Sequence, residues 1–150
     1  LNDAVADAVK AGVVAVGSAG NSAQSACKHS PASSRKAITV GATSYHGMFP
    51  PTDRLADFSN IGKCVDIFAP GENIPGAAVG TDYAIGTFSG TSQAAPHVAG
   101  AAALYLHHNP SWTPDEVWKA MKRQALVDKV LWLFSNETAN RFLNIQEIGS

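Results

Sequence analysis

The start of the chain shows two hydrophobic patterns in succession. Apolar positions recur at the spacing i, i+3, i+4, i+7 and i+8, which predicts an amphipathic helix that ends at Gly12. These positions are Leu1, Ala4, Val5, Ala8 and Val9. An apolar run at 13–16 then predicts a buried strand, and a glycine-rich loop follows at 17–21. A helix, a tight turn, a buried strand and a loop in this order are typical of an α/β fold with a parallel sheet.

Shorter apolar runs predict the remaining strands. Two buried strands are expected at 37–42 and 64–69, and the stretch 43–62 between them is expected to be a loop because it contains several helix and strand breakers. Weak alternation at 83–88 predicts a small hairpin, and 141–145 is a candidate last strand.

Two further helices are predicted in the second half of the chain. The segment 92–108 is apolar almost all round, which predicts a helix buried on every face. The next helix is predicted to start at Thr113, because Thr113 as N-cap, Pro114 at the first position and Glu116 form a capping box. Its apolar stripe consists of Val117, Trp118, Met121 and Ala125.

Composition narrows the class of protein. The chain has 150 residues, of which 45% are hydrophobic and 15% charged, with a net charge of −1. Because nucleic-acid binding requires a basic patch, we expect no nucleic-acid partner. The most apolar stretch, 98–106, is far shorter than the ~18 residues of a membrane span, so none is expected.

The two cysteines and one sequon leave alternatives open. Cys27 and Cys64 are either two buried thiols or a single bridge that closes a long loop, and neither belongs to a zinc pattern. Asn136 begins an Asn-Glu-Thr sequon, which is compatible with glycosylation and with a secreted chain.

The segment around Ser92 carries the strongest chemical signal. Ser92 lies in the first turn of a predicted helix, where unpaired N–H groups and the positive end of the helix dipole would stabilise an oxyanion. Pro96 breaks the helix rule four residues later by removing the donor for the carbonyl of Ser92. Such strain is typical of functional sites, whereas an isolated serine at this position would be an ordinary N-cap.

This segment identifies a family. Residues 90–100, Gly-Thr-Ser-Gln-Ala-Ala-Pro-His-Val-Ala-Gly, resemble the nucleophile signature of the subtilisin-like serine proteases (subtilases), Gly-Thr-Ser-x-Ala-x-Pro-His-x-x-Gly, at every fixed position. The resemblance extends over nearly the whole chain and is greatest to the proteinase K-like branch. It implies an α/β, three-layer subtilisin-like fold with a mostly parallel sheet, incomplete in this chain.

The resemblance assigns roles to residues on both sides of the site. It implies that Ser92 is the nucleophile and that the side-chain amide of Asn21 donates into the oxyanion hole; read without Ser92, Asn21 would be an ordinary loop asparagine. It implies that the primary specificity pocket is lined by Ser18, Ala19, Gly20 and Thr91.

The resemblance also bears on disulfide and metal. In secreted relatives, cysteines that bracket the strands predicted here at 37–42 and 64–69 form a disulfide. The resemblance therefore implies a bridge between Cys27 and Cys64. The same branch can hold a structural calcium, here between the carbonyls of Arg35 and Ala37 and the carboxylate of Asp66. The alternative is that Asp66 makes ordinary hydrogen bonds at a strand edge. No cofactor is expected for catalysis.

Part of the family's machinery has no counterpart in the sequence. A subtilase needs a histidine as general base and an aspartate that orients it, in Asp-[Thr/Ser]-Gly and His-Gly-Thr-His motifs that precede the oxyanion asparagine. Neither motif occurs. His97 belongs to the serine signature, and the resemblance implies that it packs the helix rather than acting as the base. We therefore expect residues 1–150 to be the C-terminal half of a catalytic domain.

These inferences define a leading hypothesis and its rivals. The expected activity is that of a serine endopeptidase acting on polypeptides, inactive without an N-terminal half that brings the base. An inhibitory propeptide and a secreted, extracellular, vacuolar or lysosomal location are also implied. The alternatives are a non-catalytic binding or regulatory module derived from a subtilase, and a nucleotide-binding domain. The Gly-x-Gly-x-x-Gly spacing fails for the last one.

Overall fold

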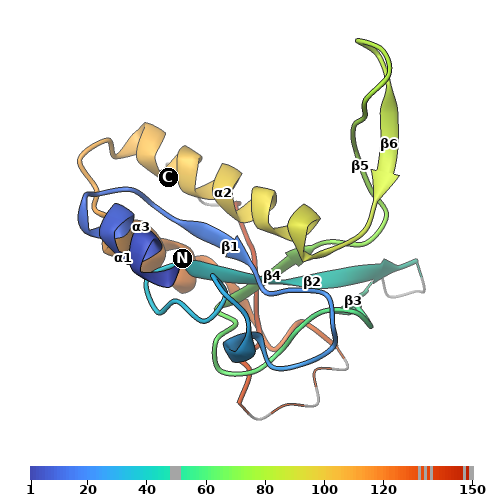
Figure 1. The fold of residues 1–150 in the computed structure, drawn as a ribbon, viewed down its shortest axis with the longest axis horizontal. Coiled ribbons are helices and arrows are strands. Elements are labelled where there is room, and N and C mark those ends of the chain that lie inside the picture. The colour runs from blue at the N-terminus through green and yellow to red at the C-terminus, as the bar shows by residue number, and fades with distance from the viewer. Residues whose placement is uncertain (48–51, 132, 134, 136, 147, 149–150) are drawn as a thin grey trace.

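A computed structural model describes residues 1–47, 52–131, 133, 135, 137–146 and 148. Figure 1 shows a twisted sheet with its longest helix lying across one face and a hairpin projecting from the end of that helix. The helices are α1 (Asn2–Lys10), α2 (Thr91–His108) and α3 (Pro114–Gln124), with a 3₁₀ turn at Ala26–Lys28. The strands are β1 (Val16–Ser18), β2 (Ile38–His46), β3 (Thr52–Leu55), β4 (Ile67–Pro70), β5 (Ile74–Ala77), β6 (Ile85–Phe88), β7 (Leu126–Val127) and β8 (Arg141–Phe142).

The main sheet is mostly parallel, as the sequence predicts. Its order is β1-β2-β4-β8-β7, and β3 pairs with β2. The pairs β1–β2, β2–β4 and β4–β8 are parallel, while β3 and β7 add antiparallel edges. Because parallel strands end at the same edge, the loops after β1 and β4 come together beside the N-terminus of α2.

Side-chain alternation in the strands builds a core on each face of the sheet. Ile67 and Ala69 of β4 face α2 and pack with its buried residues, which include Ala94 and Val98. Phe68 points to the other face, where it belongs to a second cluster with Val65 and Val130. Gly41 of β2 lies under the Phe68 ring, and a Cβ at this position would overlap the ring. The Phe68 side chain therefore requires a glycine on the neighbouring strand.

Helix α3 begins as predicted. Thr113 accepts a hydrogen bond from the N–H of Glu116, and the Glu116 carboxylate accepts one from the N–H of Thr113, which completes the capping box. These bonds lower the pKa of Glu116, because they stabilise the ionised carboxylate.

Four predictions about the elements are wrong in detail. The stretch 43–62 is not all loop, because β2 runs on to His46 and β3 pairs with it. The hairpin is larger than 83–88: Gly86 lies inside β6 opposite Gly76 of β5, and the turn lies between the two strands. Strand β1 begins at Val16, the last residue of the predicted run 13–16, and runs to Ser18, within the predicted loop. Strand β4 begins at Ile67 rather than at residue 64.

Helix α2 departs furthest from its prediction. Only one of its faces is buried, the one formed by Thr91, Ala94, Val98, Ala101, Ala102 and Tyr105. The opposite face is exposed, and the Leu104 side chain on it is 45% accessible. A helix that is apolar all round therefore has, within the described residues, a partner on one face only.

Candidate active site

The first part of the site is the loop that follows β1. Ala19 is fully buried, and its N–H donates to the carbonyl of Val40 on the neighbouring strand. Gly20 comes next with a φ of +100°, a conformation that favours glycine. This turn directs the chain out of the sheet and leaves Asn21, the predicted oxyanion donor, at the sheet edge.

The second part is the N-terminus of α2. Gly90 is the N-cap, Thr91 is fully buried and Ser92 is exposed in the first turn. The N–H groups of a first turn have no acceptor within the helix, so that of Ser92 is oriented to donate outward. Pro96 lies inside the helix and has no N–H to give to the carbonyl of Ser92, as predicted.

Hydrogen bonds join the two parts through Asn21 and Thr91. The Asn21 Oδ1 atom accepts from the N–H of Thr91 and from its Oγ1, each at 2.8 Å. Thr91 Oγ1 in turn accepts from the N–H of Gly20 at 3.1 Å. With its oxygen so engaged, the Asn21 amide has its Nδ2 donor beside Gly90, where a Cβ would lie 3.1 Å away. The carboxamide that the sequence assigned to the oxyanion hole is thus held at the helix end that carries Ser92.

The residues predicted to line a specificity pocket lie in this region. Ser18 ends β1, Ala19 and Gly20 form the turn, and Thr91 bonds to Gly20. An open groove of about 540 Å³ lies between α2 and the hairpin, and Ser92 is in its wall. It is lined by Ile74, Pro75, Gly76, Ala77, Phe88, Ser92, Gln93, Pro96 and His97.

The ring of His97 is engaged with its own helix. Its Nδ1 lies 2.8 Å from the carbonyl of Gln93, and since a carbonyl only accepts, Nδ1 carries the proton. The described residues thus bring together a nucleophile and an oxyanion donor, and none of the described histidine side chains is hydrogen-bonded to Ser92.

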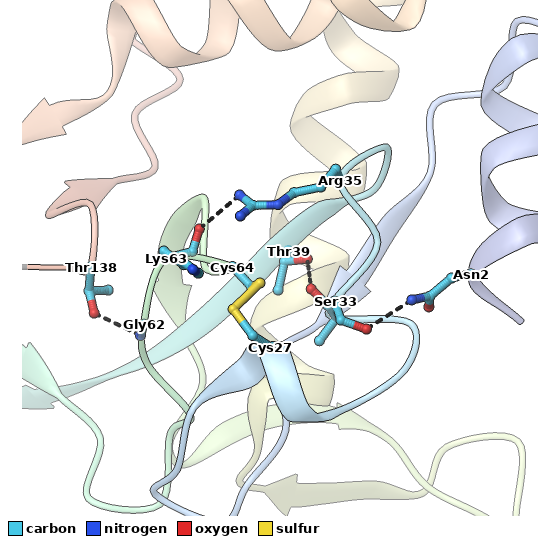
Figure 2. The surroundings of a disulfide bond; sticks show 10 residues. Asn2, Cys27, Ser33, Arg35, Thr39, Gly62, Lys63, Cys64 and Thr138 are labelled. Carbon is cyan, nitrogen blue, oxygen red and sulfur yellow. Dashed lines mark hydrogen bonds between the residues drawn. A yellow bond between two sulfur atoms is a disulfide. The ribbon is translucent and has the colours of Figure 1, made fainter.

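A disulfide joins Cys27 and Cys64, which resolves the alternatives left open by the cysteine count. The two Cα atoms are 5.3 Å apart and the bridge spans a sequence separation of 37 residues. Figure 2 shows it between the 3₁₀ turn at Ala26–Lys28 and the loop before β4, with the main-chain carbonyl of Lys63 accepting from Arg35 nearby. Both cysteines pack in the cluster of Phe68, so the bridge lies on the face of the sheet opposite α2.

The predicted calcium ligands lie around one small cavity. A pocket of about 90 Å³ has Arg35, Ala37 and Asp66 among its lining residues. Burial raises the pKa of the Asp66 carboxyl, while the N–H of Thr39, 2.8 Å from Oδ2, and the charge of Arg141 oppose this rise. One carboxylate and main-chain carbonyls are hard oxygen ligands of the kind that calcium takes. No cluster of three or more histidine, cysteine, aspartate or glutamate side chains occurs among the residues that the structure describes.

Two observations complete the account of the predicted residues. Asn136 of the sequon lies outside the described residues. Asn60, which no sequence motif marks as functional, is fully buried and contacts the loop that carries Asn21. The available signal is a polar residue between two apolar runs, within the stretch 43–62 that the sequence predicts to be a loop.

Comparison with known proteins identifies the family. The model of the Subtilase family matches residues 1–147, so the chain belongs to the subtilases. It is 50% identical over 121 residues to an extracellular serine proteinase of Thermus sp. (strain Rt41A), a match that covers 81% of this chain and 28% of that protein. It is 45% identical over 130 residues to alkaline serine exoprotease A of Vibrio alginolyticus, covering 87% of this chain and 23% of that one.

The fold agrees with that of a solved relative. A cold adapted subtilisin-like serine proteinase superposes with a TM-score of 0.84 and 41% sequence identity. The match covers 95% of this chain and 48% of the other. The subtilisin-like fold is therefore confirmed, and the chain spans about half of this solved relative and roughly a quarter of the two proteinases.

Proposed function

We propose that residues 1–150 are the C-terminal half of a subtilase catalytic domain and act in peptide-bond hydrolysis by a serine-protease mechanism. The observation that carries this proposal is the pair of hydrogen bonds from Thr91 to Asn21 Oδ1, which hold the amide donor against the helix turn that presents Ser92. A nucleophile and a fixed N–H donor side by side are what acyl transfer requires.

The roles of the residues follow from their positions. Ser92 Oγ attacks the carbonyl carbon of the scissile peptide bond to give a tetrahedral intermediate, whose C–N bond breaks to release the amine product and leave the acyl-enzyme. Water then attacks the acyl-enzyme and releases the acid product. The N–H of Ser92 and Nδ2 of Asn21 stabilise the oxyanion that forms at each step. The general base and its orienting aspartate belong to an N-terminal half of the same domain.

The exposed face of α2 supports a partner half. An apolar groove of about 550 Å³ runs along it, and Leu104 lies in its wall. Its lining is Pro70, Pro96, His97, Gly100, Ala101, Leu104, Phe142, Leu143 and Ile145. An apolar surface of this extent beside a functional site favours coverage by another part of the same domain.

The family to which the chain belongs indicates the class of substrate. The substrates are polypeptides. The turn of Ala19 and Gly20, together with Thr91, forms one wall of the specificity pocket. An N-terminal propeptide would inhibit the enzyme before activation.

A calcium ion would bind Asp66 and the carbonyls of Arg35 and Ala37 and stabilise the fold. If so, calcium should raise the melting temperature of the full-length protein, and Asp66→Asn should abolish that rise.

A secreted or extracellular location is supported by the disulfide and by the name of the Thermus relative. Vacuolar or lysosomal delivery would place the protein in comparable surroundings. None of the described helices is long and apolar enough to cross a membrane.

A non-catalytic module derived from a subtilase is the second candidate. The exposed groove between α2 and the hairpin favours it, because such a surface can bind a peptide without cleaving it. The first candidate has more support, since binding alone makes no use of a fixed amide donor beside an exposed serine.

The test is labelling of the full-length protein, meaning the polypeptide that carries residues 1–150 with whatever precedes them. A tagged fluorophosphonate should modify Ser92, as read by peptide mass, and Ser92→Ala should abolish the signal. Asn21→Ala should retain the fold but slow labelling and turnover. A full-length protein that is folded and yet unlabelled at Ser92 would overturn the protease proposal and leave the binding module.

A further inference from the structure

Asn60 is fully buried in the turn between β3 and β4, far along the chain from the catalytic loop. A buried carboxamide needs partners for both its oxygen and its nitrogen. All three of its side-chain hydrogen bonds are made to the main chain of one segment, Ala19–Gln24, which carries Asn21.

The bonds fall on both sides of Asn21. Asn60 Oδ1 accepts from the N–H of Ser22 and from that of Gln24, each at 3.0 Å. Asn60 Nδ2 donates to the carbonyl of Ala19 at 2.8 Å. The N–H of Asn60 donates to the carbonyl of Gly20 at 2.9 Å. The residues before and after Asn21 are therefore tied to a single buried side chain.

The path of this segment needs such support. Gly20 has a φ of +100°, and Ala23 has a φ of +50°, which a residue with a Cβ rarely adopts. A Cβ on Gly20 would overlap Nδ2 of Asn60, so the two residues are in direct contact. Strained conformations persist at functional sites only where the surroundings hold them, and Asn60 supplies that hold here.

We propose that Asn60 is a positioning residue for the oxyanion hole: it sets the main chain that carries Asn21, while Thr91 sets the Asn21 side chain. This inference rests on the proposed protease function. Asn60 touches neither substrate nor Ser92 in this role. Its effect is to hold Nδ2 of Asn21 where the developing charge appears, because small displacements of such a donor reduce its contribution.

The geometry requires an asparagine. The site uses two acceptor positions and one donor within a single planar group. An ionised aspartate keeps both acceptor bonds but sets a negative oxygen against the carbonyl of Ala19. A protonated aspartate can donate to that carbonyl while its other oxygen accepts, and leucine of similar size makes none of these bonds.

The main variant is Asn60→Asp in the full-length protein, assayed on a peptide substrate. At neutral pH we expect kcat to fall about tenfold, the cost of one buried hydrogen bond, with KM changed less than twofold. The ratio of variant to parent kcat should rise toward one as the pH falls, because protonation restores the donor. A ratio that is low and constant with pH, or a full kcat at every pH, would overturn the inference.

Ser59→Ala is the matched control. Ser59 is 2% exposed and adjacent in sequence. Its hydroxyl accepts from the N–H of Ala42 in the sheet and donates to the main-chain carbonyl of Asn60 at 3.1 Å, but neither bond reaches the segment Ala19–Gln24. Its loss should lower the melting temperature and leave kcat within twofold of the parent. An equal fall in kcat for both variants would show that buried bonds in this turn act through stability alone.

A double-mutant cycle separates positioning from general destabilisation. If Asn60 acts through Asn21, then Asn60→Asp should cause almost no further loss of kcat once Asn21→Ala has removed the donor. Losses that multiply would contradict the inference. Failure of the parent enzyme to label at Ser92 would instead contradict the proposed function itself, so the two failures are distinguishable.

Discussion

The side-chain oxygen of Asn21 accepts two hydrogen bonds from one residue, Thr91, through its N–H and its hydroxyl. The same hydroxyl accepts from the N–H of Gly20, so it links the loop after β1 to the first turn of α2. The loop and the helix are 70 residues apart in sequence. These hydrogen bonds therefore fix the position of the oxyanion donor, on the loop after β1, relative to the nucleophile, on α2.

Replacement of Thr91 by valine tests this link. Thr91→Val keeps the shape and the N–H but removes the hydroxyl that joins Asn21 and Gly20. We expect kcat to fall by roughly threefold to tenfold with little change in KM, the effect of about one hydrogen bond. Thr91→Ser, which retains the hydroxyl, should stay close to the parent. Steady-state kinetics on a peptide substrate measure both, and equal kcat in Thr91→Val and the parent would contradict the link.

Loss of the Asn21 amide should be larger. We expect Asn21→Ala to reduce kcat by about 10²–10³, the range measured when the equivalent donor is removed from a subtilase. The value of KM should change little, because the amide acts on the transition state. Single-turnover acylation with a chromogenic ester provides the measurement. A reduction confined to KM would place Asn21 in ground-state binding instead.

The disulfide should contribute mainly through the unfolded chain. A bridge that closes a loop of 37 residues is expected to stabilise by about 3–4 kcal/mol from loop entropy. Cys27→Ser with Cys64→Ser should lower the free energy of unfolding in urea by this amount. The bridge lies on the sheet face opposite α2, so acylation of Ser92 by the folded variant should be unchanged. A large loss of labelling in folded protein would tie the bridge to the site.

Local patterns in the sequence predicted the helix starts and the parallel sheet. The capping box of Thr113 and Glu116 lies within four residues, and its hydrogen bonds need no distant partner. The signature around Ser92 is equally local. Asn60 could not be assigned in this way, because its partners at 19–24 lie 36 to 41 residues away and a lone asparagine between apolar runs resembles any turn residue.

The faces of α2 illustrate the other limit. An apolar residue such as Leu104 predicts that something covers it but not what does so. Periodicity therefore predicted burial on all sides, whereas the described residues cover one face. Strand β3 was missed for a related reason, since pairing with β2 along an edge requires no continuous apolar run.

The exposed face of α2 makes a prediction about assembly. Leu104→Asp puts a charge into the apolar groove that we assign to the N-terminal half. We expect the full-length variant to give less soluble enzyme and a lower melting temperature. Val127→Asp is the control, because Val127 is similarly exposed, at 59%, on the edge strand β7. Equal effects of the two substitutions would contradict coverage of the α2 face.

Asp53 predicts how stability changes with pH. It lies in β3 with Thr43 Oγ1 donating to its Oδ1, and burial raises the pKa of its carboxyl despite this bond. The folded state therefore binds this proton more tightly than the unfolded state does. The stabilisation that this proton on Asp53 contributes to the fold is fully present below the pKa of Asp53 in the unfolded chain. It is lost as the pH rises through the pKa of Asp53 in the folded protein.

Asp53→Asn removes that dependence while keeping an oxygen that can accept from Thr43. The variant should gain stability relative to the parent as the pH rises above the unfolded value of 3.8, and the two should differ by a constant amount in more acid solution. Urea unfolding of both proteins across this interval measures the difference. If the stability of the variant instead falls relative to the parent as the pH rises, the ionised Asp53 carboxylate stabilises the fold, and the hydrogen bond from Thr43 outweighs the cost of burial.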